Sequence, residues 1–381
     1  MKRTLLLLLL SVSTLWGQFL PDIPDRLSYV AQFNGSTQYF SKTSSVNMDL
    51  NGSEMLTNPT LDVDITGWAI DGNVALAHET TIKRTGAGSC KITYVTTGGI
   101  KSTPINNTST NKFTLEAWVY IPAASVTRVV RIGLRNQSGA LIQGETEVTL
   151  VADTWTKIVR ITQCNGTQTS LILWVRLPSP TAGDIFYLDD VSLTQAYDGI
   201  VGLESKTTNG STQTLAGSSK SNGSRLRIWQ NTTTASVTLT DGTISVTATN
   251  SATVNDGRPH RWGVAWSRTG NLTLYIDGVA GTGQSIAGVG AVTVDTLWIG
   301  RDEAGNDFNG QIGEKVQVKY STLPTNIANW IVYVNTQRYI PEPPGGGETV
   351  LRIFGRRNDA LDQSGNQGVL TNTGATPIIP R

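Results

Sequence analysis

Aromatic and charged side chains alternate with apolar ones in three segments of this chain, residues 113–120, 128–135 and 171–177. Successive side chains of a β-strand point to opposite faces of its sheet, so the apolar set of each segment should face a core. If the segments share one sheet, the outward set is Trp118, Tyr120, Trp174, Glu116, Arg131, Arg135 and Arg176. Aromatic faces stack on pyranose rings and charged groups bond hydroxyls, so this set is predicted to bind carbohydrate.

A structural role for the same aromatic residues is the alternative. Trp118 and Trp174 could cover the sheet beneath a loop or against a second domain. Arginines beside aromatic rings would then be ordinary surface chemistry. Trp68 and Trp155 are expected in a core.

The acids and histidines do not form a recognisable catalytic pattern. Glycosidases need two carboxylates about 5 to 9.5 Å apart that face one sugar, and no Glu-x-Asp-x-Glu strand occurs here. Asp189 and Asp190 are adjacent, so on a strand their side chains face opposite ways. His260 is expected to be structural and His78 to be solvated. The chain is therefore predicted not to be an enzyme and to have no catalytic residues.

The composition indicates an all-β protein. Only 15% of the 381 residues are charged, and 30 Lys and Arg against 29 Asp and Glu leave a net charge of +1. Nucleic-acid binding depends on a concentrated basic patch, so no nucleic-acid partner is expected. Two His and two Cys also exclude zinc fingers and disulfide-stapled scaffolds. Alternating strands between glycine turns predict antiparallel sandwiches, and the length suffices for at least two.

The first 17 residues have the pattern of a secretory signal peptide. A basic start, Met1-Lys2-Arg3, precedes a leucine run that ends near Trp16, and this run is shorter than the roughly 20 residues that span a bilayer. An uncleaved hydrophobic anchor is the alternative. The protein is expected to be secreted or at a cell surface, or on the virion surface if it is viral. In that setting Cys90 and Cys164 could form a disulfide or remain two buried free thiols.

Four segments near the C-terminal half carry a family resemblance: Asp256–Trp262, Leu274–Gly278, Trp298–Arg301 and Phe308–Ile312. Their order and spacing resemble the laminin-G-like and concanavalin A-like jelly-roll lectin sandwich. The strand that opens this fold resembles Ala31–Phe40. Far more residues lie between the two parts than the fold needs, so the resemblance implies an insertion.

The intervening region has its own signature. Five of its segments resemble carbohydrate-binding modules of the family-four/nine type, a galactose-binding-like jelly roll: Leu56–Asp62, Thr66–Trp68, Phe113–Tyr120, Thr154–Lys157 and Phe186–Leu193. The ends of such a module lie close together, so it can be inserted into a surface loop of a host domain. The resemblance also implies a structural calcium ion held by Asp62 and Asp190.

These features predict two antiparallel β-sandwiches, one nested inside a loop of the other, and a C-terminal strand. The predicted order is a signal peptide (1–17), a concanavalin A-like and laminin-G-like host sandwich in two pieces (23–53 and 196–337), an inserted jelly roll (54–195), a Pro/Gly linker (338–348) and a C-terminal strand segment (349–381). Val350–Phe354 is apolar and strand-prone. The tail from about residue 349 to 373 is expected to add a strand to the concanavalin A-like sheet beside Ala31–Phe40, either in its own chain or in a neighbour.

Two functions fit this organisation. The first is a secreted, non-catalytic protein that recognises glycans or polysaccharide in adhesion. The second is a structural subunit of an extracellular fibre or virion, whose C-terminal strands could join subunits in self-assembly. A glycoside hydrolase, or an accessory to one, is disfavoured. None of these functions requires a cofactor, and any calcium ion that the resemblance implies would be structural.

Overall fold

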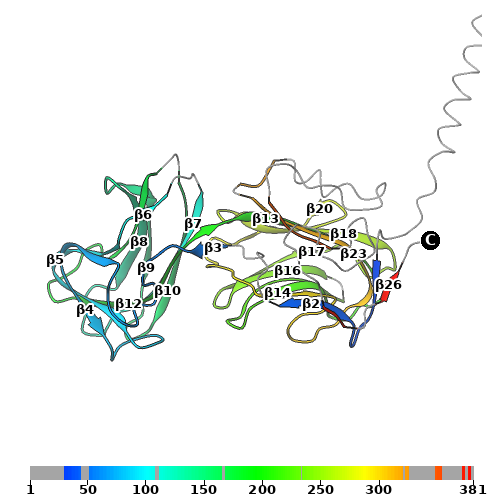
Figure 1. Cartoon of the computed structure of the whole chain (residues 1–381), viewed down its shortest axis with the longest axis horizontal. Helices are drawn as coiled ribbons and strands as arrows, with labels where there is room; N and C mark the ends of the chain where they lie inside the picture. The colour runs from blue at the N-terminus through cyan, green and yellow to red at the C-terminus, as the bar shows by residue number, and fades with distance from the viewer. Residues whose placement is uncertain are drawn as a thin grey trace, which may run out of the picture.

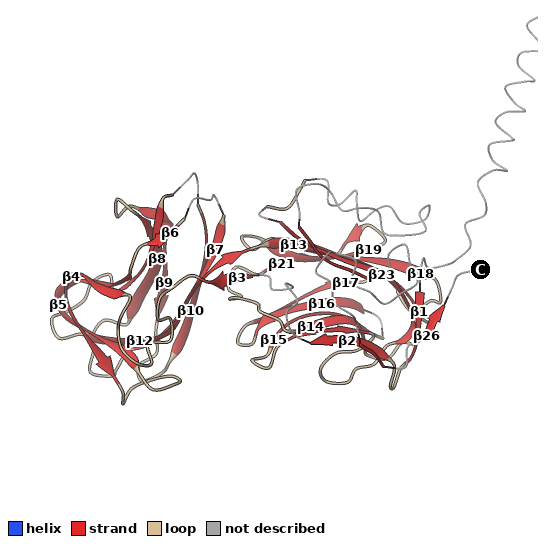
Figure 2. Cartoon of the chain, in the orientation of Figure 1, coloured by secondary structure: helices blue, strands red, loops and turns tan. Residues whose placement is uncertain are grey.

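The structure is a computed structural model that describes residues 30–43, 51–107, 111–164, 168–232, 234–320, 322–325, 348–353, 371–373 and 376–378. Every regular element in these ranges is a β-strand, as Figure 2 shows, so the predicted all-β fold is confirmed. The same ranges contain no helix that could cross a membrane. The predicted signal peptide and nearly all of the predicted linker lie outside them.

Strands β3 to β12 form one curled antiparallel sheet, ordered β10-β7-β12-β5-β11-β8-β9, and β3, β4 and β6 pair with β12, β5 and β11. Their bounds are β3 Asn51–Glu54, β4 Trp68–Glu79, β5 Ser89–Ser102, β6 Ile105–Asn106, β7 Lys112–Tyr120, β8 Val129–Asn136, β9 Leu141–Thr149, β10 Thr156–Gln163, β11 Ser170–Arg176 and β12 Ile185–Ala196. This body is the insert.

The long strand β5 joins the two layers of the insert. Its first part pairs with β12, and its last part pairs with β11. Between them Gly98 has a φ of 136°, and a Cβ there would lie 2.0 Å from the carbonyl oxygen of Asp71. Only glycine tolerates this backbone, so the chain can turn here and fold the sheet over its own core.

The host domain consists of two further sheets. The nine-stranded sheet has the order β20-β19-β18-β13-β23-β1-β26, with β21 on β19 and β24 on β23. Its bounds are β1 Val30–Asn34, β13 Asp198–Lys206, β18 Pro259–Trp266, β19 Asn271–Ile276, β20 Val279–Ala280, β21 Gln284–Ser285, β23 Asn309–Tyr320, β24 Glu348–Ile353 and β26 Thr376–Ile378. β18 and β19 pair as antiparallel neighbours, with Trp262 opposite Ile276.

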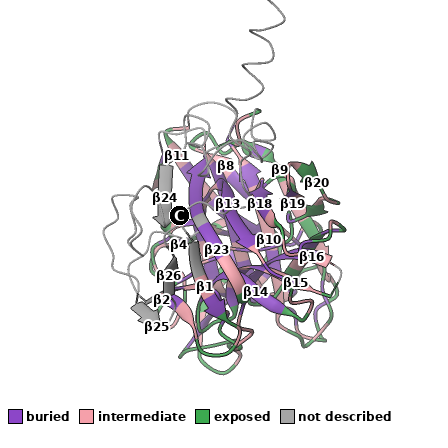
Figure 3. Ribbon diagram, turned by 90° about the vertical axis from the view of Figure 1, so that its right-hand side faces the viewer, coloured by how far each residue is buried: buried purple, intermediate pink, exposed green. Residues whose placement is uncertain are grey.

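The seven-stranded sheet has the order β17-β16-β15-β14-β22-β2-β25. Its bounds are β2 Tyr39–Thr43, β14 Gln213–Ser219, β15 Ser224–Asn231, β16 Thr234–Asp241, β17 Ser245–Asn250, β22 Thr296–Ile299 and β25 Thr371–Thr373. The two host sheets enclose one apolar core, and β13 and β18 are buried along nearly their whole length (Figure 3). Figure 1 shows host and insert as two bodies side by side.

The nested order is visible in the strand pairing. β1 pairs with β23 and β2 pairs with β22, so the chain enters both host sheets before it forms the insert. The predicted single strand Ala31–Phe40 is wrong, because the chain turns at Gly35, whose φ is 75°, and continues in the other sheet. The residue numbers of the domain boundaries remain predictions.

Host and insert meet at a buried polar junction. β12 ends at Ala196 and β13 begins at Asp198, so the connection is one residue long. Lys112 of the insert forms a buried ion pair with Asp198 of the host. The amide of Val292 donates to Asn51 at 3.0 Å. Because these groups are buried, their pairing avoids the cost of leaving charges and amides unsatisfied.

The C-terminal segment pairs with its own chain. β24 lies along β23, whereas β25 lies along β2 and β26 lies along β1. The prediction that the tail from about residue 349 to 373 adds a strand beside Ala31–Phe40 is confirmed by β25, which pairs with Tyr39, Phe40 and Ser41. The apolar part of that tail, β24, lies along β23 instead. It is the later strands, β25 and β26, that cover the N-terminal strands, and all three cover sheet edges that would otherwise be unpaired.

Candidate functional site

The predicted alternation of the three insert strands is confirmed. The side chains predicted to face the core are buried: Phe113, Leu115, Ala117, Val119, Val130, Ile132, Leu134, Leu171, Leu173, Val175 and Leu177. All belong to one apolar cluster. The alternate side chains therefore point away from this core, as period-two geometry requires.

The three strands belong to one sheet, as the prediction required, but they do not share one outer face. β7 pairs with β10 and β12, whereas β8 and β11 follow on the far side of β5. The two ends of this path approach each other, because Arg160 of β10 donates to the Thr146 hydroxyl of β9 at 3.1 Å. The outer sides of the two layers therefore point in different directions.

The predicted site residues are consequently divided between two surfaces. The first, the Trp118 face, is the outer side of β7 and β12 and holds Trp118 and Tyr120. The second, the Trp174 face, is the outer side of β4, β5, β11, β8 and β9 and holds Trp174, Arg131, Arg135 and Arg176, together with the charged residues Asp71, Lys101, Glu145 and Glu147.

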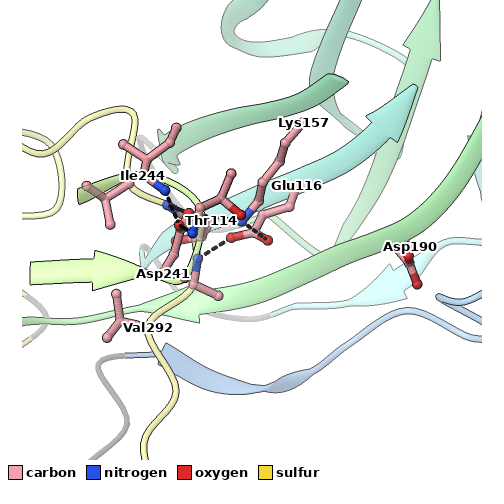
Figure 4. Close-up of polar contacts among 12 residues, drawn as sticks. Thr114, Glu116, Lys157, Asp190, Asp241, Ile244 and Val292 are labelled. Atoms are coloured by element: carbon pink, nitrogen blue, oxygen red, sulfur yellow. Dashed lines mark hydrogen bonds and ion pairs between the residues drawn. The ribbon is translucent and has the colours of Figure 1, made fainter. Parts of the chain in front are cut away.

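Glu116 lies on neither surface but at the junction with the host (Figure 4). One of its carboxylate oxygens lies 3.1 Å from the ammonium of Lys157. The other accepts a hydrogen bond from the amide of Ala291. Lys157 also forms an ion pair at 2.9 Å with Asp241 of the host. Glu116 therefore joins the two domains and is not available to a sugar.

The Trp118 face carries the partly exposed rings of Trp118, Tyr120 and Trp155 beside the buried ring of Tyr187. The Arg84 guanidinium lies 3.7 Å from the centre of the Trp118 ring. Tyr120 contacts Trp155 and Tyr187, with ring centres 5.6 and 5.8 Å apart. Trp155 therefore lies outside the core, contrary to prediction, whereas Trp68 is buried in it as predicted.

The hydroxyl of Tyr120 is fixed by a carboxylate. It donates to Asp153 at 3.0 Å. Burial and this hydrogen bond raise the pKa of Tyr120 above its ordinary value. The tyrosine is therefore neutral at physiological pH, with its ring held against Trp155.

On the Trp174 face, two guanidinium groups cover the indole. Arg135 and Arg176 lie 3.1 and 4.5 Å from the ring centre, and Trp174 is only 6% exposed. Trp174 was predicted to be an open stacking platform, which is wrong. Its cross-strand neighbours are Lys101 and Gly133, so space for the two long arginine side chains exists over a glycine.

Ion pairs connect the charged side chains around Trp174. Asp71 pairs with Arg135 at 2.8 Å and with Lys101 at 3.1 Å. Glu145 accepts two hydrogen bonds from Arg176, at 3.0 and 2.9 Å. Arg131 pairs with Glu147 and lies 3.7 Å from Glu145. The alternation of Glu145 and Glu147 in residues 141–149 was the available sequence signal for these acids, and it was missed.

Two donors on this face remain unused. The indole Nε1 of Trp174 and the Nε of Arg135 are buried, and neither has a hydrogen-bond acceptor among the described residues. A buried N–H without an acceptor costs about 1–3 kcal/mol. Such groups are rare in folded proteins and need a specific explanation.

The contacts of Asp62 and Asp190 do not fit the calcium ion that the family resemblance implies. Asp190 accepts from the Arg84 guanidinium at 2.6 Å and from the Thr85 hydroxyl at 2.7 Å. Asp62 accepts instead from the amide of Ala87 at 2.6 Å. Among the described residues no three His, Cys, Asp or Glu side chains form a metal cluster. A guanidinium at Asp190 supplies positive charge where a cation would bind.

Cys90 and Cys164 are free and buried, so the disulfide alternative is not realised. Burial raises the pKa of Cys90 to about 12 and that of Cys164 to about 11. Both thiols are therefore protonated at physiological pH and act as small apolar side chains of the insert core.

The two histidines have structural partners. His260 lies between Asp277, at 2.6 Å from Nδ1, and Asp256, at 3.0 Å from Nε2. Its structural role fits the prediction. The Nε2 of His78 lies 3.1 Å from the carbonyl oxygen of Leu61 and is half-buried, so the prediction of a solvated side chain is wrong.

No protein-family model and no curated protein matches the chain. Among solved structures, it is similar to the CBM22-1 xylan-binding domain from Paenibacillus barcinonensis Xyn10C, with 18% identity, a TM-score of 0.31 and coverage of 38% of this chain and 96% of that one. The CBM22-1-CBM22-2 tandem domain of the same protein is 12% identical, with a TM-score of 0.32 and coverage of 68% of this chain and 97% of that one.

An arabinose-bound MgGH51 α-L-arabinofuranosidase gives 16% identity, a TM-score of 0.34 and coverage of 44% of this chain. The chain spans only 32% of that enzyme. TM-scores between 0.31 and 0.34 are too low to support a conclusion about this chain. Similarity at this level assigns the protein to no family.

Proposed function

We propose that this protein is a non-catalytic glycan-binding protein and that the Trp174 face is its binding surface. The observation that carries the proposal is the pair of buried, unused donors, Trp174 Nε1 and Arg135 Nε. A ligand oxygen that accepts from them would remove an existing cost of burial. Binding at this place therefore gains more than a hydrogen bond on an open surface.

The mixture of charges around these donors favours a hydroxyl-rich ligand. Arg131 and Lys101 supply donors, while Asp71, Glu145 and Glu147 supply acceptors on the same face. A sugar hydroxyl donates and accepts at once, so it can use both kinds. The ion pairs already hold these side chains in place, which reduces the entropy lost on binding.

The guanidinium groups over Trp174 change the expected mode of recognition. Because Arg135 and Arg176 cover the indole, a sugar would contact the arginine planes and their N–H groups. Hydrogen bonding would contribute more than stacking at this face. The acids beside it are each paired with a cation, which suits binding better than proton transfer and supports a role without catalysis.

An extracellular site of action is part of the proposal. Its support is the basic and then leucine-rich start of the chain, Met1 to Leu10. The buried thiols of Cys90 and Cys164 do not depend on an oxidising compartment. Adhesion to a polysaccharide is the activity that this location and the Trp174 face together favour.

The test compares two arginines that each lie on a tryptophan and pair with an aspartate. Arg135 lies on Trp174 and pairs with Asp71, and Arg84 lies on Trp118 and pairs with Asp190. Calorimetry of the full chain with a panel of soluble polysaccharides, xylan among them, would measure affinity. We expect Arg135→Gln to weaken binding about tenfold or more, because charge-assisted hydrogen bonds contribute about 1.5–3 kcal/mol.

Arg84→Gln is the matched control and should keep its affinity within about twofold. Circular dichroism on both variants would establish that the fold is retained. An equal loss in both variants, or no binding to any polysaccharide of the panel, would contradict the proposal.

A further inference from the structure

A second polar and aromatic surface lies on the host domain. It is the outer side of the seven-stranded sheet, opposite to the side chains that form the host core. We name it the Trp229 face. Neighbouring strands place on it Thr247 of β17, Thr238 of β16, Arg225, Arg227 and Trp229 of β15, Gly217 and Ser219 of β14, Trp298 of β22 and Tyr39 of β2.

Two partly exposed indoles are anchored on this surface. Nε1 of Trp229 donates to the Thr238 hydroxyl at 3.0 Å, and Nε1 of Trp298 donates to the Ser219 hydroxyl at 3.2 Å. Both tryptophans keep part of their surface accessible. Their N–H groups are already satisfied by the sheet, so the rings are fixed in orientation. The Arg227 guanidinium lies 4.8 Å from the centre of the Trp229 ring, and the Tyr39 ring centre lies 5.6 Å from that of Trp298. The part of each ring that stays accessible is what a ligand can use.

Strand β14 lies between β15, which carries Trp229, and β22, which carries Trp298. It has a glycine, Gly217, on the outer side of the sheet. Gly217 is the cross-strand neighbour of both Arg227 and Trp298. A Cβ at Gly217 would meet no atom closer than 3.8 Å, so packing does not require glycine here. The nearest atoms belong to Leu226, Arg301 and Asp302, so the segment that pairs with Arg227 passes beside Gly217.

Arginine donors without acceptors point to a ligand. Arg227 bonds Asp302 and Thr214, both at 2.9 Å, yet its Nη2 is buried without a partner among the described residues. The Nε of Arg225 is also buried without a hydrogen-bond partner among the described residues, although its Nη1 pairs with Glu303 at 2.7 Å. Two unused donors two residues apart on one strand can bind neighbouring oxygens of one molecule.

The charge of the surroundings selects the class of ligand. Three cations, Arg225, Arg227 and Arg301, face three acids, Asp302, Glu303 and Asp307. An anionic ligand would gain from the arginines and be repelled by the acids. A neutral ligand with hydroxyl groups can accept from the arginine N–H groups and donate to the threonine and serine oxygens.

We propose that the Trp229 face is a second binding site, specific for neutral oligosaccharides. Sugar rings lie on the faces of Trp229 and Trp298, and their hydroxyls accept from Arg225 and Arg227. This site belongs to the host domain and shares no residue with the Trp174 face. Its existence therefore does not depend on the function proposed for the insert.

The experiment follows the indole N–H signals of the full chain in ¹H–¹⁵N NMR spectra. The probes are four neutral hexasaccharides, namely cellohexaose, xylohexaose, maltohexaose and chitin hexamer, and one acidic probe, a galacturonate hexamer. We expect at least one neutral probe to shift the signals of both Trp229 and Trp298. The acidic probe should leave both signals unchanged.

Variants then measure the contribution of the ring. Trp229→Ala should weaken binding of the same probe about tenfold or more, because a buried tryptophan contact is a typical binding hot spot. Trp229→Phe retains an aromatic face and should lose about threefold or less. Trp155→Ala, which removes a partly exposed tryptophan from the insert, is the matched control and should bind like the native chain.

The outcomes for the two faces can be separated. In the Arg135→Gln chain, the shifts of Trp229 and Trp298 should persist even if the Trp174 signal no longer responds. The proposal is overturned if no neutral probe shifts both signals, if the galacturonate hexamer alone binds, or if Trp229→Ala binds with native affinity. Since the shifts are recorded on the unaltered chain, a variant that fails to fold does not prevent this decision.

Discussion

Contacts between arginine and tryptophan recur on all three surfaces of the molecule. Arg84 lies on Trp118, Arg135 and Arg176 lie on Trp174, and Arg227 lies 4.8 Å from the centre of the Trp229 ring. A guanidinium loses less hydration than an ammonium on such a ring and keeps its edge for hydrogen bonds. The extent to which the arginines and their neighbours cover each indole differs, so Trp174 is buried whereas Trp118 and Trp229 stay partly exposed.

Trp174 behaves as a buried residue in this comparison. Because only 6% of it is exposed, Trp174→Ala should reduce the free energy of unfolding by about 3–5 kcal/mol. Trp118→Ala, at a partly exposed ring, should cost clearly less. Urea unfolding of both variants would measure this. If Trp174→Ala lowered the free energy of unfolding no more than Trp118→Ala does, Trp174 would not be a buried residue.

His260 gives the molecule a pH dependence with a defined sign. Burial lowers the pKa of His260, but hydrogen bonds to Asp277 and Asp256 raise it more, so the pKa lies above its ordinary value. A raised pKa in the folded state means that protonation stabilises the fold. This stabilisation is complete below pH of about 6.5, the unfolded pKa, and is lost as the pH rises through the folded pKa.

The free energy of unfolding of the native chain should therefore exceed that of His260→Gln by more at pH 5.5 than at pH 8.5. Urea titrations of both proteins at the two pH values give this difference directly. Groups that do not contact His260 contribute equally to both proteins, and its partner Asp256, whose pKa is already lowered, stays ionised at both pH values. A difference that stays constant, or that grows at pH 8.5, would exclude a charged His260 in the folded state.

At the scale of elements, the alternation of buried and outward side chains along each strand was predictable. Which layer of the insert each strand belongs to was not. The buried positions of β7, β8 and β11 follow from local period-two patterns such as Phe113 and Leu115. The separation of Trp118 from Trp174 follows from strand order and from the turn at Gly98, which depend on pairing between distant segments. Nesting was predictable because motifs of one sandwich flank those of another in the sequence.

Removal of the C-terminal strands should weaken the host domain. A chain truncated after Pro344 lacks β24, β25 and β26, so the edges of β23, β2 and β1 lose their partners. We expect a lower melting temperature by circular dichroism and, by light scattering, the same oligomeric state as the full-length chain. An assembly of the full-length chain that dissociates on truncation would instead show that the strands also pair between chains, as in the fibre alternative.

At the scale of the whole molecule, the junction couples two bodies that each have a core. Asp241 illustrates this, since it accepts from Lys157 of the insert at 2.9 Å and from the host amides of Thr243 and Ile244 at 2.8 and 2.7 Å. Arg268 of the host is fully buried beside Thr114 of the insert, at 3.4 Å. Such contacts were not predictable, because charged residues on separate domains carry no pattern that relates them.

Deletion of the insert tests its independence. A chain that joins Gly52 to Tyr197 keeps the strands of both host sheets and should unfold in one cooperative transition. Its midpoint should fall, because Asp198 and Asp241 lose their lysine partners and Arg268 loses its hydrogen bond to Thr114. Asp198→Asn in the deleted chain should recover part of the loss. Absence of sheet signal by circular dichroism in both chains would show that the host needs the insert to fold.

The direct passage from β12 into β13 has a mechanical consequence. Only Tyr197 separates the two strands. Before it, β12 is hydrogen-bonded on both edges, to β3 and to β7. After it, β13 is hydrogen-bonded on both edges, to β18 and to β23. An interdomain hinge needs a few residues whose backbone dihedral angles can change. This connection has only one such residue. Tension on a polymer held by the insert would travel along a paired backbone into the centre of the host sheet and load many hydrogen bonds in shear.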